Sequence, residues 1–202
     1  AGRIADDLDE PAPAPGERAL TDAPGSLTDA PGSVLDAVVG VGANLGDREA
    51  ALAHAVYVLG CAAEITALSS LYATAPVGPP QPEFLNAALR VRWSGAPREL
   101  LDLCLRIDAA AGRVRRERWR PRTADLDILW VRGLVVDKPG LTVPHPRLAE
   151  RAFALLPLLE VAPDARDPRT GARYGDLAPE GDILRLPARL RARLPPRPAR
   201  SR

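Results

Sequence analysis

The sequence predicts an α+β fold, in which a largely antiparallel sheet carries helices packed against it. In residues 84–93, every second side chain from Leu85 to Trp93 is apolar, and this period of two is typical of a strand. Residues 97–111 instead repeat apolar side chains at helical spacing, and Pro97 occupies a first-turn position. Strands mixed with a few helices favour this fold class.

The other elements follow from turn residues and apolar periodicity. Asp47 is the expected N-cap of a first helix, and Gly112 is expected to end the second. Residues 74–82 contain four prolines and should form a stiff loop. In chain order we expect strands over 36–42, 64–72, 84–93 and 123–131, helices over 48–59 and 97–111, helical turns over 148–159, and irregular sequence after them.

One folded domain is expected over residues 37–184, between two tails. Residues 1–36 form an acidic leader rich in Ala, Pro and Gly, expected to be disordered, in which the segment at 21–26 recurs at 28–33. Because the chain begins with alanine, this leader could be a processed terminus or a linker cut from a longer fused protein. Residues 185–202 hold seven arginines and no acid, and a frayed tail is expected there.

Composition narrows the functional classes. The net charge is only +1, and no apolar run approaches the roughly 18 residues that a membrane helix needs. We therefore expect a soluble, cytoplasmic protein. The two cysteines, Cys61 and Cys104, are far apart and are interpreted as buried small apolar residues, rather than as part of a disulfide framework or a zinc site.

Two carboxylates mark the last predicted strand. Asp125 and Asp127 should project together from one face, away from a core formed by the alternate residues Ala124, Leu126, Ile128 and Trp130. Carboxylates spaced in this way can bridge one or two hard cations, and magnesium suits such oxygen ligands best. Taken alone, the pair could also be a solvated strand face.

A basic segment directly precedes these carboxylates, because six of the ten residues 113–122 are arginines. Taken alone, it could be a basic surface patch, or an RNA contact in which Trp119 stacks on a base. Carboxylates aimed at the same place would repel phosphate unless a cation lay between them. The combination therefore favours metal-assisted phosphoryl transfer on a polyphosphate.

A second group of residues suits a flat heterocycle. Phe84 and Asn86 share one face of a predicted strand, and Thr74 and Val77 belong to the stiff loop before it. An aromatic ring and an amide two residues apart could stack on such a heterocycle and hydrogen-bond it, although ordinary packing is the alternative. His145, held between two prolines, could contact a phosphate.

Together these segments resemble the 6-hydroxymethyl-7,8-dihydropterin pyrophosphokinase family of folate biosynthesis. The resemblance covers about residues 37–165, and its most specific run is Arg-Trp-x-Pro-Arg-Thr-x-Asp-Leu-Asp-Ile at 118–128. The other motifs follow in the family's order and at similar spacing: Val-Gly-Ala-Asn-Leu-Gly-Asp at 41–47, Ser-Ser-Leu-Tyr-x-Thr at 69–74, Pro-Val-Gly-Pro at 76–79, Phe-Leu-Asn-Ala at 84–87, Gly-Arg-Val-Arg at 112–115 and Leu-Thr-Val-Pro-His-Pro-Arg at 141–147.

The resemblance implies a ferredoxin-like α+β sandwich and transfer of the β,γ-pyrophosphoryl group of ATP to the pterin hydroxymethyl oxygen, leaving AMP. It implies that Asp125 and Asp127 bind two magnesium ions that bridge the ATP phosphates, and that Arg113 and Arg122 stabilise the moving group. The implied ATP-binding residues are Asp108, Arg115, Ile128, Thr142, His145 and Arg151. The implied pterin-binding residues are Thr74, Val77, Phe84, Asn86, Trp119 and Phe153.

The chain departs from the family's pattern at a few positions. Ala43 replaces a common serine, Phe84 a frequent tyrosine and Asp108 a frequent glutamate, while Gly140 stands where some members place a nucleotide-contacting arginine. Two other functions stay open: a ferredoxin-like nucleic-acid-binding module, and a catalytically silent domain that binds a pterin or a nucleotide. The expected partners are the small molecules ATP and hydroxymethyl-dihydropterin, without membrane or nucleic acid, and the chain could be fused to, or dock with, a neighbouring folate-pathway enzyme.

Overall fold

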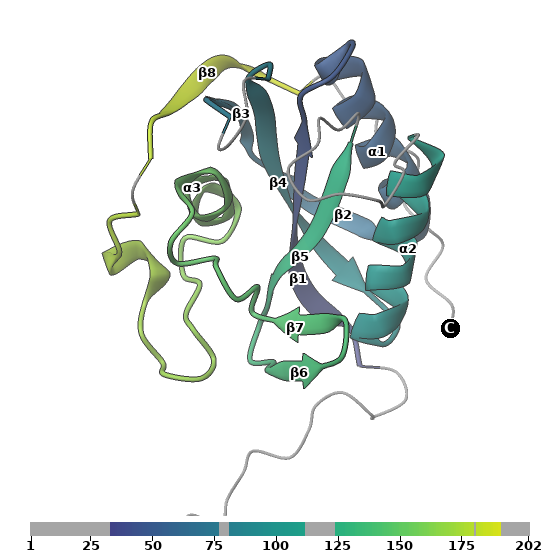
Figure 1. The fold of residues 1–202 in the computed structure, drawn as a ribbon. Helices are drawn as coiled ribbons and strands as arrows, with labels where there is room; N and C mark the ends of the chain where they lie inside the picture. Colours follow the sequence, from purple (N-terminus) through teal and green to yellow (C-terminus); the bar gives the residue numbers. More distant parts are fainter. Residues whose placement is uncertain (1–32, 77–80, 112–123, 180, 191–202) are drawn as a thin grey trace, which may run out of the picture.

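The computed structural model describes residues 33–76, 81–111, 124–179 and 181–190. In this part of the chain, a six-stranded sheet lies between two helical layers (Figure 1). The helices α1 (Arg48–Ala62) and α2 (Pro97–Ala110) cover one face, and α3 (Ala152–Val161) covers the other. A small two-stranded sheet of β6 (Val136–Lys138) and β7 (Leu141–Val143) precedes α3, and a short 3-10 helix (Tyr174–Asp176) follows it.

Every strand pair that the structure describes is antiparallel, as predicted. The order in the main sheet is β5-β1-β4-β3-β8, with β2 also paired to β4. The strands are β1 (Leu35–Ala43), β2 (Glu64–Leu68), β3 (Ser70–Thr74), β4 (Phe84–Trp93), β5 (Asp125–Val131) and β8 (Ile183–Arg189). The predicted α+β class is therefore confirmed.

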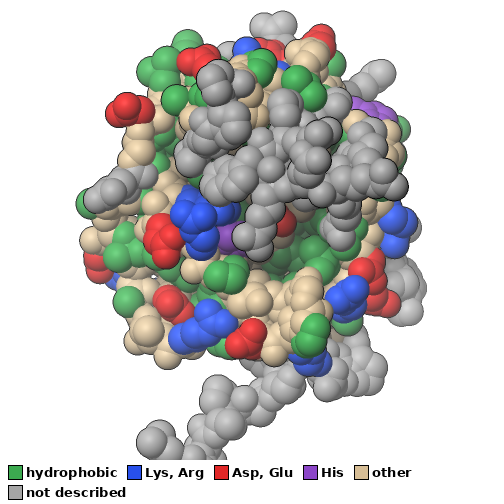
Figure 2. All heavy atoms as spheres, viewed as in Figure 1, with side chains coloured by type: hydrophobic (Ala, Val, Ile, Leu, Met, Phe, Trp, Pro, Cys, Tyr) green, Lys and Arg blue, Asp and Glu red, His purple; other side chains and the backbone are tan. Residues whose placement is uncertain are grey.

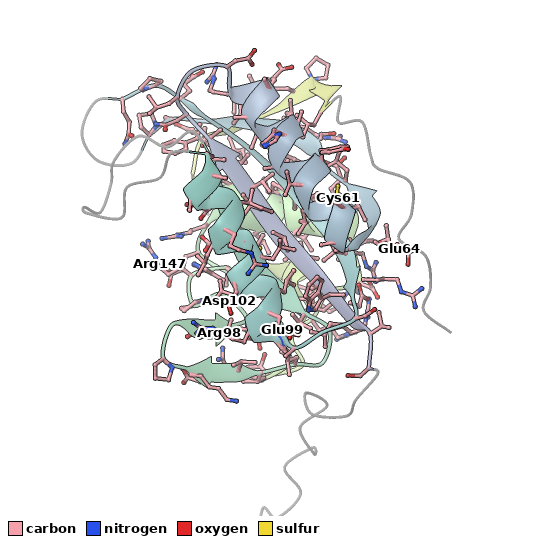
Figure 3. All side chains as sticks on the ribbon, turned by 90° about the vertical axis from the view of Figure 1, so that its right-hand side faces the viewer. Cys61, Glu64, Arg98, Glu99, Asp102 and Arg147 are labelled. Carbon is pink, nitrogen blue, oxygen red and sulfur yellow. The ribbon has the colours of Figure 1, made fainter. Side chains whose placement is uncertain are left out.

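Local signals explain where the first two helices begin. Asp47 caps α1, as predicted, by accepting a hydrogen bond from the amide of Ala50 at 3.0 Å. At α2, Pro97 occupies the first turn and Glu99 accepts a hydrogen bond from the amide of Ala96 at 2.8 Å. The two helices lie side by side over the sheet (Figure 3) and each buries one apolar face, formed by Leu52, Val56 and Leu59 in α1 and by Leu100, Cys104 and Ile107 in α2.

Alternation along the central strands gives the sheet two buried faces. On β4, Leu85 and Leu89 join the core under α1 and α2, whereas Ala88 joins the core under α3. On β1, Val39 is buried in the core under α1 and α2, and Val38 is buried in the core under α3. The strand predicted over 84–93 is confirmed at both ends, and the sheet is the middle layer of a sandwich (Figure 1).

The alternation predicted for β5 is wrong near its end. Ile128 faces the core under α1 and α2, as expected, but Trp130 packs into the core under α3. The cause is a register shift, because Ile128 pairs with Val39 and Trp130 with Val38, which leaves Leu129 as an extra residue. Such a bulge reverses the facing of the residues that follow it.

Two further strands differ from the sequence expectation. The strand predicted over 64–72 is broken at Ser69, whose hydroxyl accepts a hydrogen bond from the amide of Ala88 at 2.9 Å and donates to the carbonyl of Ser70 at 2.8 Å. Residues 183–189, predicted to be irregular and then a frayed tail, form β8 and pair with β3. The regular structure therefore continues past residue 184, where the folded domain was predicted to end, and includes the first residues of the predicted tail.

Smaller differences complete the comparison. The β6–β7 pair was not expected, and Cys61 is exposed, whereas Cys104 is buried as expected. The acidic leader up to residue 32, the basic segment 113–122 and the last part of the tail lie outside the described residues. Among the residues that are described, no helix has the length and apolar character needed to cross a membrane.

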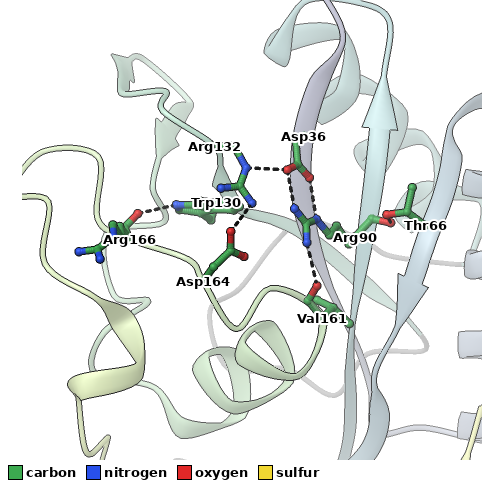
Figure 4. A network of polar contacts seen from close by, with 8 residues as sticks. All are labelled: Asp36, Thr66, Arg90, Trp130, Arg132, Val161, Asp164 and Arg166. Atoms are coloured by element: carbon green, nitrogen blue, oxygen red, sulfur yellow. Dashed lines mark hydrogen bonds and ion pairs between the residues drawn. The ribbon is translucent and has the colours of Figure 1, made fainter.

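A charged network ties the sheet to the end of α3 (Figure 4). Asp36 of β1 accepts hydrogen bonds from Arg90 of β4 at 2.7 and 2.8 Å, and from Arg132 at 2.8 Å. Arg90 also donates to the carbonyl of Val161 at 3.4 Å, and Arg132 pairs with Asp164 at 2.9 Å. The hydrogen bond from Arg90, helped by the one from Arg132, outweighs burial and lowers the pKa of Asp36.

We predict that Asp36→Asn lowers the free energy of unfolding at pH 7 by about 1–3 kcal/mol, because hydrogen bonds to an ionised group are lost. A carboxyl group whose pKa is lowered by folding contributes stability above its unfolded pKa, and this contribution disappears as the pH falls through the folded value. The difference from the parent chain should therefore be full at pH 7 and shrink below about pH 4. Denaturant unfolding at several pH values measures it, and a difference that does not depend on pH would contradict this account.

Candidate active site

The register of β1 aligns a predicted metal ligand and a predicted pterin-binding residue across the sheet. Gly42 is paired with Asp125 of β5 on one side and with Asn86 of β4 on the other. Directly paired residues of antiparallel strands point to the same face. The predicted metal ligand and the predicted pterin-binding amide therefore share the α3 face of the sheet, with a glycine between them.

A second line runs two residues further back along β1, where Gly40 is paired with Asp127. Both glycines permit close approach, because a Cβ atom added at Gly42 would lie 3.0 Å from Oδ1 of Asn86, and one added at Gly40 would lie 3.0 Å from Cδ1 of Leu129. At these two positions β1 therefore places no side chain of its own between the carboxylates and β4.

Asn86 is buried and is held by β3. Its amide nitrogen donates a hydrogen bond to the hydroxyl of Thr74 at 3.0 Å, and Thr74 is buried as well. Phe84 lies two residues before Asn86 on the same face of β4 and is half-buried. The structure thus brings together three of the predicted pterin-binding residues, whereas Val77 and Trp119 lie outside the described residues.

Phe153 comes to the same side of the sheet from α3. It is half-buried against the core under α3, and the guanidinium carbon of Arg151 lies 5.6 Å from the centroid of its ring. The whole chain contains only two phenylalanines, Phe84 and Phe153, and both belong to elements on this side. This placement suits aromatic contacts to a flat ligand.

A cavity of about 210 Å³ collects further predicted residues where α2, β5 and β7 meet. Its lining includes Asp127, Ile128, Thr142 and His145, beside Leu101, Gly140, Leu141 and Pro146. Gly140 has a φ of 77°, a backbone conformation that favours glycine. A larger cavity, of about 430 Å³, lies at the start of α1, and its described lining includes none of the predicted site residues.

The pKa of His145 is shifted by burial and by the charges of two carboxylates and two arginines. Burial lowers its pKa most, Asp127 and Asp125 raise it, Arg151 and Arg147 lower it, and the net direction is downward. Its Nδ1 accepts a hydrogen bond from the amide of Arg147 at 3.2 Å, so the neutral ring carries its proton on Nε2. On the face of the molecule that Figure 2 shows, basic, acidic and histidine side chains lie together near the middle.

Asp108 has a contact that the sequence did not reveal. It is buried in α2, and its Oδ1 accepts a hydrogen bond from the amide of Leu126 at 2.9 Å. Leu126 lies between Asp125 and Asp127, so Asp108 ties α2 to the strand that presents both carboxylates. A nucleotide contact of Asp108 stays a prediction.

Asn44 supports the site, although it was not among the residues predicted to belong to it. It is 1% exposed, and its amide nitrogen donates to Oε1 of Gln81 at 3.0 Å and to the carbonyl of Pro82 at 3.3 Å. Arg48 adds a hydrogen bond to the carbonyl of Glu83 at 2.8 Å. The residue directly after β1 and the first residue of α1 therefore hold the chain just before β4 begins. The sequence signal that could have predicted this contact is the position of a polar residue directly after a buried strand.

The carboxylate pair suits magnesium. Asp125 is half-buried and Asp127 is exposed, and their positions lie roughly 7 Å apart along the strand. Magnesium prefers oxygen ligands and usually completes its six positions with waters and substrate phosphates. Among the described residues, no group of three or more His, Cys, Asp or Glu side chains could hold a metal ion. Arg113, Arg115 and Arg122 lie outside those residues.

Comparison with known proteins places the chain among its relatives. The model of the 7,8-dihydro-6-hydroxymethylpterin-pyrophosphokinase (HPPK) family matches residues 38–163. The chain belongs to this family. A 2-amino-4-hydroxy-6-hydroxymethyldihydropteridine pyrophosphokinase of Bacillus subtilis is 44% identical over 139 residues, which cover 67% of this HPPK chain and 83% of the relative. The enzyme of the same name from Synechocystis sp. is 42% identical over 139 residues, which cover 67% and 70%.

Solved structures agree on the fold. The crystal structure of wild-type Plasmodium falciparum HPPK-DHPS matches with a TM-score of 0.57 at 12% identity, over 71% of this chain and 44% of that one. A second HPPK-DHPS structure, in complex with substrates, has the same TM-score and covers 72% and 42%. This HPPK chain therefore has the expected ferredoxin-like α+β fold and spans less than half the length of those HPPK-DHPS chains.

We predict that the pKa of His145 in the metal-free chain lies below the usual value of 6.5, because burial disfavours the charged ring. Asp127→Asn should lower it further, since the carboxylate of Asp127 favours the imidazolium. An NMR titration of the ring proton signals measures both values, with His145→Gln assigning the signal. A pKa that rises in Asp127→Asn would be incompatible with this geometry.

Proposed function

We propose that this HPPK chain transfers the pyrophosphoryl group of ATP to the hydroxymethyl oxygen of 6-hydroxymethyl-7,8-dihydropterin, giving AMP and the pterin diphosphate in folate biosynthesis. One observation carries the proposal: Gly42 is paired with both Asp125 and Asn86. Neighbouring strands lie about 4.8 Å apart, so the backbones of these two residues are separated by roughly 10 Å. One bound pterin can then contact the amide while its substituent reaches a phosphate held at the carboxylates.

On the pterin side, polar and aromatic contacts orient the substrate. Asn86 can recognise the amide edge of the pterin with its carboxamide, which Thr74 holds in place. Phe84 and Phe153 supply rings that can stack on the heterocycle. Holding the hydroxymethyl group near the phosphate removes much of the entropic barrier to a reaction between two substrates.

On the phosphate side, Asp125 and Asp127 would hold the two magnesium ions, which when bound neutralise phosphate charge. Arg113 and Arg122 are the proposed cations against the moving group, on the basis of the family's motif. Positioning and charge neutralisation are what phosphoryl transfer chiefly requires of an enzyme. The two aspartates and the two proposed arginines are residue types that can supply both.

The cavity beside Asp127 is the proposed binding place for the nucleoside part of ATP. Its volume of about 210 Å³ is below the roughly 300–1,000 Å³ of pockets that enclose whole ligands, so it suits one part of a nucleotide. Ile128 contributes apolar surface, while Thr142 and the neutral ring of His145 contribute hydrogen-bonding groups. Arg115 and Arg151 are proposed to contact the nucleotide on the basis of the motif alone.

The family match and the curated relatives give no support to the nucleic-acid-binding alternative. A catalytically silent domain that binds the ligands without turnover is distinguished from an enzyme by its lack of product. HPPK units occur in HPPK-DHPS chains, and we extend this to a proposal that the present chain is fused to, or docks with, a neighbouring folate-pathway enzyme. A cytoplasmic location stays a prediction.

Product identity tests the proposed function directly. The chain is incubated with ATP, magnesium and 6-hydroxymethyl-7,8-dihydropterin, and the nucleotides are separated by chromatography, with a chelator added as the control. AMP formed in equal amount to a pterin diphosphate is expected, because two phosphates move together. ADP would indicate transfer of a single phosphate, and binding without any product would indicate a silent domain.

We expect Asp127→Asn to abolish magnesium-dependent turnover without unfolding the chain, because this exposed side chain lies outside both cores. The matched control is Asp176→Asn, which makes the same change at an exposed position of the short 3-10 helix and should keep full activity. Turnover and thermal unfolding are measured on both variants. Normal turnover in Asp127→Asn, or loss of its fold, would argue against a metal-binding role.

A further inference from the structure

One more carboxylate on the α3 side, Glu160, accepts four hydrogen bonds. Its Oε2 accepts from the amide of Ser70 at 3.1 Å and from the hydroxyl of Tyr72 at 3.0 Å. Its Oε1 accepts from the hydroxyl of Ser70 and from the guanidinium of Arg185, both at 2.9 Å. An ionised carboxylate offers about four acceptor positions, so these donors saturate it. We call these four residues the Glu160 clamp.

The clamp joins three elements: Glu160 comes from α3, Ser70 and Tyr72 from β3, and Arg185 from β8, which lies beyond the residues matched by the family model. Burial, and then the hydrogen bond to Glu160, raises the pKa of Tyr72 to about 12. Burial alone would raise the pKa of Glu160, but the hydrogen bonds from Ser70, Tyr72 and Arg185 outweigh it and lower this pKa. The tyrosine is therefore a donor and the carboxylate an acceptor at neutral pH.

The clamp acts on the line of residues that contains the pterin-binding amide. Tyr72 is paired with Asn86 on one side and with Arg185 on the other. Two residues further along β3, Thr74 accepts the hydrogen bond from Asn86. Any shift of β3 against β4 would therefore move the group that orients this amide.

The clamp also fixes α3. In Figure 1, α3 is seen end-on while the central strands run up the view, so the helix crosses the strands. Phe153 and Glu160 are seven residues apart in α3, so they lie on the same side of the helix and roughly 10 Å apart along its axis. Fastening Glu160 to β3 therefore sets where Phe153 lies relative to Phe84 and Asn86 on the sheet.

We propose that the Glu160 clamp positions the pterin side of the active site, by holding β3 and α3 in the one arrangement that lets Thr74, Asn86 and Phe153 contact the same ring. This inference rests on the proposed function. Glu160 and Arg185 are positioning residues in this scheme, because they act through Tyr72 and Ser70 rather than on the substrate.

The Asp36 network offers a matched comparison. Asp36 also accepts charged hydrogen bonds from arginines and also links the sheet to the end of α3. Its partner Arg90, however, lies four residues from Asn86 along β4, roughly 13 Å away. If Glu160 only stabilised the fold, its removal would resemble the removal of Asp36. If it positions the pterin residues, the two variants will differ in pterin binding.

The test is Glu160→Gln, which places an amide donor against groups that are themselves donors. We expect the Kd of 6-hydroxymethyl-7,8-dihydropterin, measured by calorimetry with magnesium and α,β-methylene-ATP present, to rise on the order of 10-fold. The Kd of α,β-methylene-ATP alone should stay within about twofold. In turnover assays, the KM for the pterin should rise while the KM for ATP does not.

Three other variants complete the design. Asp36→Asn should lose thermal stability comparably but keep the pterin Kd within about twofold. Tyr72→Phe keeps the ring and removes one donor, and Arg185→Ala removes another, so both should weaken pterin binding in the same direction by a smaller factor. These two serve in place of Glu160→Gln if that variant does not fold.

The outcomes separate the two proposals. Pterin affinity that is unchanged in the clamp variants, or that falls together with nucleotide affinity, overturns the positioning role and leaves the enzyme assignment intact. An effect of Asp36→Asn equal to that of Glu160→Gln also overturns it. Absence of pterin binding by the unaltered chain overturns the proposed function, and the inference with it.

Discussion

The site depends on one backbone constraint, the hydrogen-bonded register of β1 between β4 and β5. Through this register Gly42 has Asn86 on one side and Asp125 on the other. A slip by one residue would turn every side chain of a strand to the opposite face, and the carboxylate and the amide would no longer share a surface. Packing opposes such a slip, because Val39 and Val38 are buried in different cores on the two faces of the sheet.

The same constraint explains why β1 contains glycines where a strand would normally gain from larger residues. Glycine inside a strand costs roughly 0.5–1 kcal/mol relative to alanine. At Gly42, however, a Cβ atom would crowd Oδ1 of Asn86 at 3.0 Å, and at Gly40 it would crowd Leu129 at the same distance. The bulge at Leu129 belongs to this arrangement, since the extra residue turns its side chain over Gly40. The two glycines therefore lower the local stability of β1 but let the side chains of Asn86 and Leu129 lie close to its backbone.

Sequence patterns predicted the parts of the fold that are set by neighbouring residues. The alternation at 84–93 and the cap at Asp47 are of this kind. The bulge in β5 was missed because its partners, Val38 and Val39, lie far away in the chain. The strand β8 was missed because a proline interrupts it and its pairing partner is β3.

The site shows the same division. A period of two predicts that Asp125 and Asp127 point to the same face of their strand, and that Phe84 and Asn86 do so on theirs. The grouping of Ile128, Thr142 and His145 around one cavity came only from the family resemblance, since these residues share no local pattern. Glu160 was not recognised at all, because it acts on Ser70, 90 residues earlier in the chain. Contacts between distant residues need the folded arrangement before they can be seen.

The strand β8 also affects whether another molecule can add a strand to the sheet. It forms one margin of the sheet, where unpaired backbone groups would normally invite another chain to add a strand. Pro187 lies within it and has no N–H to offer, and its ring disfavours further pairing. Leu184 is 64% exposed there, and the proline two residues from the neighbouring Arg185 of the Glu160 clamp is one of the devices by which edge strands disfavour the addition of a further strand.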